Sequence, residues 1–212
     1  MDSARDAPGR ISGLYCEKTG GVENAVVGVG RISNLIKNRL TALVAGFVLA
    51  IGLVAVVSAT EYSVGSGPDD WWISYPDQSP ASGTDVNHPD WVLDALDDKS
   101  VLIYAHRECS YCKPQTDAIN EIVDEYGDDI EFYEILGDGS DERIEDVFEA
   151  YDPNGGTSTV PLTAIVTLVA GEDGGAEVAW HSTEGVTGKE WIGGYVEDAI
   201  GYHEENVENW DA

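Results

Sequence analysis

Basic residues are scarce in this sequence. Its 212 residues include 11 Lys and Arg against 40 Asp and Glu, which gives a formal net charge of -29. A chain this acidic repels a phosphate backbone, so nucleic-acid binding is excluded as a function. Internal repeats are absent, which excludes a repeat array. Hydrophobic residues make up 42% of the chain, which is enough to build a core and excludes wholesale disorder.

The few basic residues are unevenly placed along the chain. Residues 1–39 hold six basic and four acidic side chains, whereas the rest holds five and thirty-six. Between them, residues 40–60 contain no charge. A helix of this length spans about 31 Å, close to the ~30 Å of a bilayer core. The segment predicts an uncleaved transmembrane helix, and the alternatives are a buried core helix or a cleaved signal peptide.

The charges beside this segment predict its orientation. Arg31, Lys37 and Arg39 precede it, and the next basic residue is Lys99. The positive-inside rule therefore places the N-terminus in the cytoplasm and everything after residue 60 outside. The acidic residues are interspersed through amphipathic segments, which indicates a charged coat on a folded domain. In this respect the chain resembles proteins of salt-loving archaea.

Five regions are expected along the chain. Residues 1–39 are predicted to be a largely flexible cytoplasmic tail and residues 40–60 the transmembrane helix. Residues 61–86 are rich in Gly, Pro, Ser and Asp, which predicts an extracytoplasmic linker. Trp71, Trp72 and Tyr75 interrupt this composition, and they are expected either to sit at the membrane interface or to pack on the domain. Residues 87–205 are expected to form the folded domain, followed by an acidic tail at 206–212.

Hydrophobic periodicity within residues 87–205 predicts an α/β domain. After an opening helix over 89–99, the order is βαβαββα. Strands are expected at 101–105, 130–136, 162–169 and 177–181. Helices are expected after residue 112, from residue 140 to 151 and from residue 187 onward. The βαβ half predicts parallel strands and the second half an antiparallel hairpin, so the sheet is mixed. His181 and His203 are predicted to be surface residues.

Two of the three cysteines form a Cys-X-X-Cys motif at Cys109 and Cys112. The motif lies between an apolar strand and the N-terminus of an amphipathic helix, where unpaired N–H groups and the helix dipole favour a thiolate. Cys109 is the expected exposed nucleophile and Cys112 the resolving thiol. Structural zinc, the competing interpretation, needs about four ligands, and Cys16 is predicted across the membrane. We therefore expect neither a metal nor another cofactor.

The strand over residues 101–104, the motif Cys109-Ser110-Tyr111-Cys112-Lys113 and the pair Val160-Pro161 together resemble the thioredoxin-like superfamily. The resemblance covers roughly residues 88–205 and implies the thioredoxin fold. It implies a cis Val160–Pro161 bond beside the cysteines, with Val160, Pro161 and Tyr111 binding substrate. An ordinary trans-proline at a strand entry is the alternative.

The sequence departs from thioredoxins proper at several positions. Glu108 stands where they have Trp, Ser110-Tyr111 replaces Gly-Pro, and Ile103 occupies the place of a buried Asp. Glu108 or Asp117 is a candidate substitute for that acid.

Charged neighbours of the motif are candidates for tuning the pKa of Cys109. His106, Arg107 and Lys113 would lower this pKa on approach, and Glu108 would oppose them. For His106 the alternative is a strand-end residue that faces solvent.

These features predict a membrane-tethered thiol–disulfide oxidoreductase, single-pass in the cell membrane, with its redox domain extracytoplasmic. It would act on protein thiols or disulfides outside the membrane and exchange electrons with a redox partner. Two alternatives stay open. One is a redox-inactive thioredoxin-like binding or chaperone module. The other is a cytoplasmic glutaredoxin-like enzyme, which requires that residues 40–60 do not span a membrane.

Overall fold

The computed structural model describes residues 61–211. The predicted cytoplasmic tail and the predicted transmembrane helix over 40–60 lie outside these residues. Within residues 61–211, no helix combines the length and the apolar character needed to cross a membrane.

Helices and strands follow the predicted order. They are α1 (Asp90–Leu96), β1 (Ser100–His106), α2 (Lys113–Tyr126), β2 (Ile130–Leu136), α3 (Arg143–Tyr151), β3 (Leu162–Ala170), β4 (Ala176–Glu184), α4 (Lys189–Asn206) and a 3-10 turn at Val207–Asn209.

The four strands form one mixed sheet in the order β2-β1-β3-β4. β1 runs parallel to β2, with Ser100 opposite Ile130. β3 runs antiparallel to β1, with Leu162 opposite Ala105, and pairs antiparallel with β4. The central strand β1 is buried along its whole length, as its apolar composition predicts. The architecture is α/β with a mixed sheet and flanking helices, compatible with a thioredoxin-like fold.

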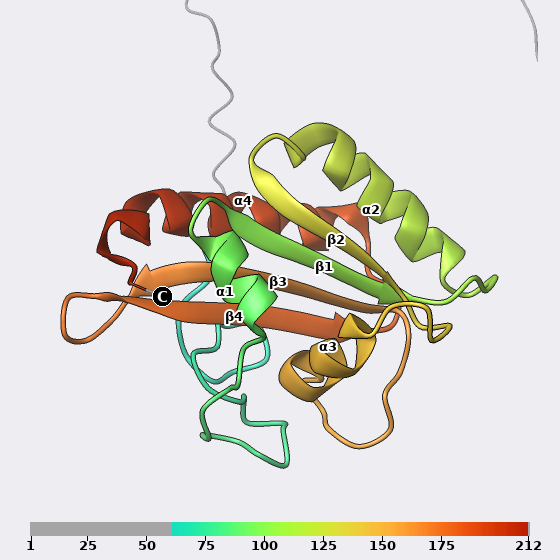
Figure 1. The fold of residues 1–212 in the computed structure, drawn as a ribbon, viewed down its shortest axis with the longest axis horizontal. Helices are drawn as coiled ribbons and strands as arrows, with labels where there is room; N and C mark the ends of the chain where they lie inside the picture. Colours follow the sequence, from blue (N-terminus) through green and yellow to red (C-terminus); the bar gives the residue numbers. More distant parts are fainter. Residues whose placement is uncertain (1–60, 212) are drawn as a thin grey trace, which may run out of the picture. The chain divides into compact units, whose positions relative to one another are not determined.

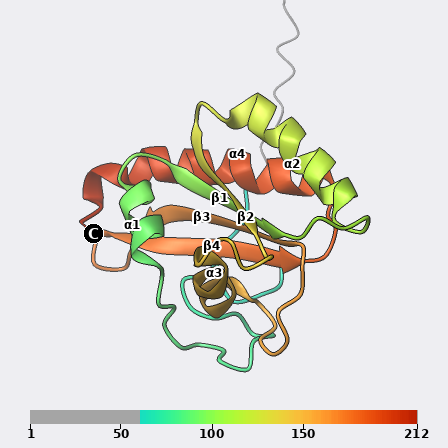
Figure 2. The ribbon, with the colours of Figure 1, turned by 45° about the vertical axis from the view of Figure 1, so that its right-hand side comes forward.

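Alternate residues of the strands build two hydrophobic layers. Leu102 and Tyr104 of β1 face α2 and α4, whereas Val101 and Ile103 face α1 and α3. Figures 1 and 2 show α2 and α4 together on one side of the sheet and α3 on the other. This arrangement brings the first turn of α2 over the end of β1.

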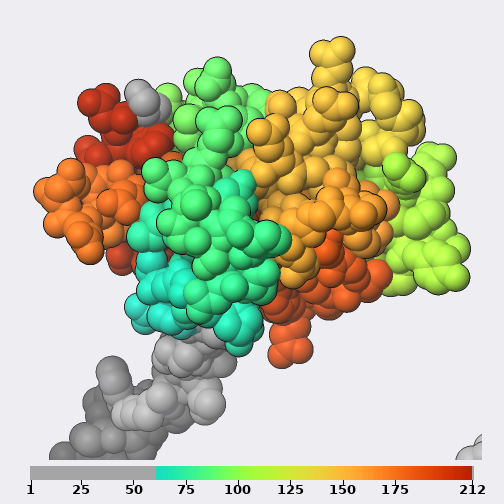
Figure 3. All heavy atoms as spheres, turned by 90° about the horizontal axis from the view of Figure 1, so that it is seen from below, coloured from blue at the N-terminus to red at the C-terminus, as the bar shows by residue number. Residues whose placement is uncertain are grey.

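Residues 61–86 belong to the folded domain, so the predicted linker is wrong. Trp71 is 0% exposed and Trp72 1% exposed. The backbone of Trp72 also pairs with Trp180 of β4 through two hydrogen bonds of 2.9 Å. Figure 3 shows this segment lying against the body of the domain. Burial of the two indole rings removes a large apolar area from water. The resulting stabilisation holds the segment on the domain, although its Gly and Pro content is typical of a linker.

A buried carboxylate on α4 fixes the start of this segment. Asp198 accepts hydrogen bonds from the indole N–H of Trp71 at 2.7 Å and from the backbone N–H of Tyr62 at 3.1 Å. The ring of Tyr62 stacks on that of Tyr195, with centroids 3.8 Å apart. Burial raises the pKa of Asp198, while the two hydrogen bonds oppose this shift.

The C-terminal end and two histidines also differ from expectation. Helix α4 continues to Asn206, and Trp210 packs on the hydrophobic core, so residues 206–211 are part of the domain and not a free acidic tail. His181 and His203 are 3% and 6% exposed, respectively. His203 makes a 2.8 Å hydrogen bond to the carbonyl oxygen of Leu96, and His181 makes one of the same length to that of Asp70. Both predictions of surface histidines are therefore wrong.

Candidate active site

The Cys-X-X-Cys motif forms a turn between β1 and α2. The backbone N–H of Cys112 donates to the carbonyl oxygen of Cys109 over 3.1 Å. Cys112 is the N-cap residue of α2, and Pro114 lies in the first turn of the helix. Proline is tolerated there because the N–H groups of the first turn have no partner within the helix. The cysteines therefore lie at a helix N-terminus, as the sequence predicts.

The two thiols differ sharply in their surroundings. They are not joined by a disulfide; Cys109 is exposed and Cys112 is fully buried. The backbone N–H of Cys112 also points at Sγ of Cys109, at 3.2 Å. One sulfur is therefore presented to solvent and held by a donor, and the other lies directly behind it.

These surroundings separate the pKa values of the two thiols. A hydrogen bond from the Cys112 thiol is the main cause that lowers the pKa of Cys109. The backbone N–H groups of Cys112 and Tyr111 and the charge of Arg107 lower it further. Burial raises the pKa of Cys112, and its hydrogen bond to Cys109 adds to this rise. The thiolate therefore forms preferentially at Cys109, which suits nucleophilic attack.

Of the four charged residues predicted to tune the pKa of Cys109, Arg107 lowers it, and two of the other three have partners of their own. His106 is 6% exposed, so the alternative of a solvent-facing histidine is wrong; its Nε2 lies 2.9 Å from Oε1 of Glu134. Lys113 forms an ion pair with Asp117 at 2.8 Å. Glu108 is exposed in the turn before the motif. Of the charged groups in this region, Arg107 is the one that lowers the pKa of Cys109.

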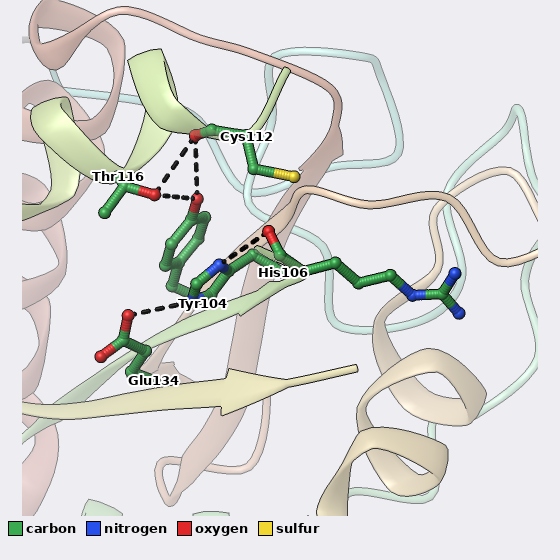
Figure 4. A network of polar contacts seen from close by, with 6 residues as sticks. Tyr104, His106, Cys112, Thr116 and Glu134 are labelled. Atoms are coloured by element: carbon green, nitrogen blue, oxygen red, sulfur yellow. Dashed lines mark hydrogen bonds and ion pairs between the residues drawn. The ribbon is translucent and has the colours of Figure 1, made fainter. Parts of the chain in front are cut away.

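A polar network beneath Cys112 was missed by sequence reasoning. The hydroxyl of Tyr104 donates to the carbonyl oxygen of Cys112 over 3.2 Å and lies 2.9 Å from Oγ1 of Thr116, which also contacts that carbonyl. The Tyr104 ring stacks on His106, with centroids 4.4 Å apart. Figure 4 shows Tyr104 standing between the sheet and the first turn of α2. The sequence does give one indication of this network, because a tyrosine within a buried strand needs a hydrogen-bond partner for its hydroxyl.

The residues predicted to bind substrate lie at the same end of the sheet. The Val160–Pro161 bond is cis, as the resemblance implies. β3 begins at Leu162 opposite Ala105, so Val160 and Pro161 run alongside the segment that leads from β1 to Cys109. The side chain of Tyr111 is 83% exposed.

A cleft of about 740 Å³ adjoins this end of the sheet. Arg107 and Val160 line it, together with Phe148 and Glu149 of α3 and Tyr75 of the N-terminal segment. Arg107 therefore contributes both to the cleft and to the field at Cys109.

No group of three or more His, Cys, Asp or Glu side chains within residues 61–211 could hold a metal ion.

Comparisons with known proteins find matches among solved structures. No protein-family description and no curated protein matches the chain. Among solved structures, it is similar to the crystal structure of the pneumococcal exposed lipoprotein thioredoxin from Streptococcus pneumoniae strain TIGR4. The two are 18% identical, and the match covers 50% of this chain and 89% of that one with a TM-score of 0.33.

Proposed function

We propose that this protein is a membrane-tethered thiol–disulfide oxidoreductase that acts through Cys109 and Cys112 on extracytoplasmic protein substrates. The observation that carries the proposal is the asymmetry of the pair. An exposed sulfur accepts the N–H of Cys112 at 3.2 Å, and a buried thiol lies behind it. A structural pair gains nothing from one exposed, acidified thiol, whereas an attacking and a resolving thiol require this difference.

In the reductive direction the exchange has two steps. The Cys109 thiolate attacks one sulfur of a substrate disulfide, so that a Cys109–substrate S–S bond forms and the substrate S–S bond breaks. The released substrate thiolate takes a proton from water. Cys112 then loses its proton to water and attacks Sγ of Cys109, which releases the second substrate thiolate and forms the Cys109–Cys112 disulfide. Two electrons pass from the dithiol to the substrate, and a partner dithiol restores the reduced pair.

Turnover assays with the full chain test this function. We expect catalysis of insulin reduction with dithiothreitol as the electron source, or of disulfide formation in reduced ribonuclease. Both activities should be lost in Cys109→Ser. Cys112→Ala should accumulate mixed disulfides through Cys109. A matched Cys16→Ser variant should keep full activity. A wild-type chain that binds unfolded proteins but catalyses neither reaction would instead be a redox-inactive binding module.

The tethering rests on the charge-free segment over residues 40–60 and on the basic residues that precede it. A reporter fused after residue 212 should be accessible from outside intact cells. A chain from which residues 40–60 are deleted should lose membrane association. Recovery of the intact chain in the soluble cytoplasmic fraction would refute the anchor and favour the glutaredoxin-like alternative.

A further inference from the structure

The described domain begins directly after the predicted transmembrane segment, and its first residues are already fixed on α4. The backbone N–H of Tyr62 donates to the carboxylate of Asp198 over 3.1 Å, and its carbonyl oxygen accepts the hydroxyl of Tyr202 at 3.0 Å. The Tyr62 ring stacks on Tyr195, with centroids 3.8 Å apart. Both main-chain groups and the side chain of Tyr62 are therefore held, two residues after the predicted span ends.

Helix α4 leaves room for this contact. A Cβ atom at Gly194 would lie 2.8 Å from the hydroxyl oxygen of Tyr62, closer than real Cβ atoms approach a neighbour. The indole N–H of Trp71 donates to the same Asp198 carboxylate over 2.7 Å, so this side chain holds the segment at two points. We call Tyr62, Trp71 and Asp198 the tether clamp.

The tether clamp limits how far the domain can move from the end of the predicted span. Two residues extend to at most about 7 Å, so Tyr62 stays within that distance of residue 60. A free linker over residues 61–86 would average about 28 Å from end to end and could extend to about 90 Å. The clamp thus leaves a short tether where the composition of the segment indicates a long one.

The redox pair lies a short way along the same helix. Gln115, three residues after Cys112, accepts the backbone N–H of Thr187 through its Oε1 at 2.7 Å, and Thr187 lies two residues before α4. Asp198 is nine residues past the first residue of α4, which corresponds to about 14 Å along the helix axis. Together with the short tether and the ~10 Å width of a helix, this keeps Cys109 within roughly 30 Å of the end of the span.

We propose that the tether clamp holds the redox pair close to the membrane surface, and that its substrates are disulfides of other membrane-bound proteins within this reach. The proposal rests on the proposed function, because the clamp limits reach only if residues 40–60 span the membrane. A tethered site meets partners within its reach at a high effective concentration and does not meet partners fixed beyond it. A soluble protein diffuses to the site and is not selected in this way.

Probes of different height test the reach of the full chain in phosphatidylcholine vesicles. Each probe is a peptide disulfide joined to a lipid by a run of prolines, which extends about 3.1 Å per residue. Six, fifteen and thirty prolines then give a short, a middle and a long probe of about 19, 47 and 93 Å. The chain is reduced beforehand and freed of reductant. In a single turnover, the wild type should reduce the short probe about fivefold or more faster than the long one.

An insertion of thirty Gly and Ser residues between Thr60 and Glu61 lengthens the tether and leaves every contact of the clamp intact. Because such a chain can extend to roughly 100 Å, the short and long probes should now be reduced at rates within about twofold of each other. The same thirty residues added after residue 212 are the matched control and should keep the wild-type ratio. Reduction of soluble insulin should be unchanged in both chains.

The clamp itself is tested by the double variant Tyr62→Ala and Asp198→Ala, which frees the chain as far as Trp72 and adds about 35 Å of reach. This variant should reduce the middle probe about threefold or more faster than the wild type does. No gain, equal wild-type rates with the short and long probes, or an unchanged ratio after the insertion would overturn the proposal. A wild-type chain that does not reduce insulin, or does not insert into vesicles, would instead remove the proposed function.

Discussion

Replacing Tyr104 with Phe isolates a single hydroxyl beneath the resolving cysteine. This hydroxyl donates to the carbonyl oxygen of Cys112 and contacts Thr116. The carbonyl oxygen would still accept the backbone N–H groups of Gln115 and Thr116, each at 3.0 Å, so no buried acceptor is left without a partner. The ring and its stacking on His106 also remain. The variant should therefore lose one ordinary hydrogen bond, about 1 kcal/mol of unfolding free energy.

Denaturant unfolding of the full chain measures this difference. Tyr133→Phe is a matched control, because Tyr133 lies on the neighbouring strand opposite Ile103 and packs against the other face of the sheet. A double-mutant cycle of Tyr104→Phe with Thr116→Val should show coupling of about 0.5 kcal/mol or more, since the two hydroxyls are in contact. Additive effects of the two substitutions would refute the reasoning. A loss of unfolding free energy above about 3 kcal/mol in Tyr104→Phe would refute it as well, because a change of that size indicates a cavity or packing defect.

Two further predictions concern charge. Burial lowers the pKa of His88 and of His181 to about 4. Unfolding returns each pKa to about 6.5, so between these two values the unfolded chain binds more protons than the folded chain. The folded state therefore loses stability as the pH falls from about 6.5 to 4. His181→Gln should reduce this slope in acid unfolding curves, and an unchanged slope would contradict the assignment. Arg107→Gln should raise the pKa of Cys109, measured from the pH dependence of alkylation, whereas Lys113→Gln should leave it unchanged. Equal shifts in the two variants would show that Arg107 does not lower the pKa of Cys109 more than Lys113 does.

Local patterns were sufficient to predict the scaffold of the site. The apolar run over residues 101–105 indicated a central strand, and the structure extends it to Ser100–His106. The amphipathic period after Cys112 indicated a helix, which placed both cysteines at its N-terminus. These features depend on residues within a few positions of one another, so the sequence carries them directly.

Features that depend on distant partners were not predictable from the sequence. Trp72 pairs with Trp180, which lies 108 positions later, so the local Pro and Gly content of its segment gave the wrong answer. His106 lies within hydrogen-bond distance of Glu134 on the neighbouring strand β2. The sequence around His106 does not indicate whether its side chain contacts Glu134 or Cys109. The contacts of Gln115 with Thr163 and Thr187 likewise exist only once β3 and the β4–α4 loop are in place.

The pairing of Trp72 with Trp180 has a consequence for self-association. β4 is the last strand of the sheet, and an open outer strand is a template on which another chain can add a strand. Trp72 occupies both main-chain groups of Trp180 near the middle of β4. At the opposite edge, β2 carries the exposed carboxylates of Glu131 and Glu134, which repel a second acidic chain. Through this pairing, the segment over residues 61–86 disfavours edge-to-edge aggregation of the domain at β4.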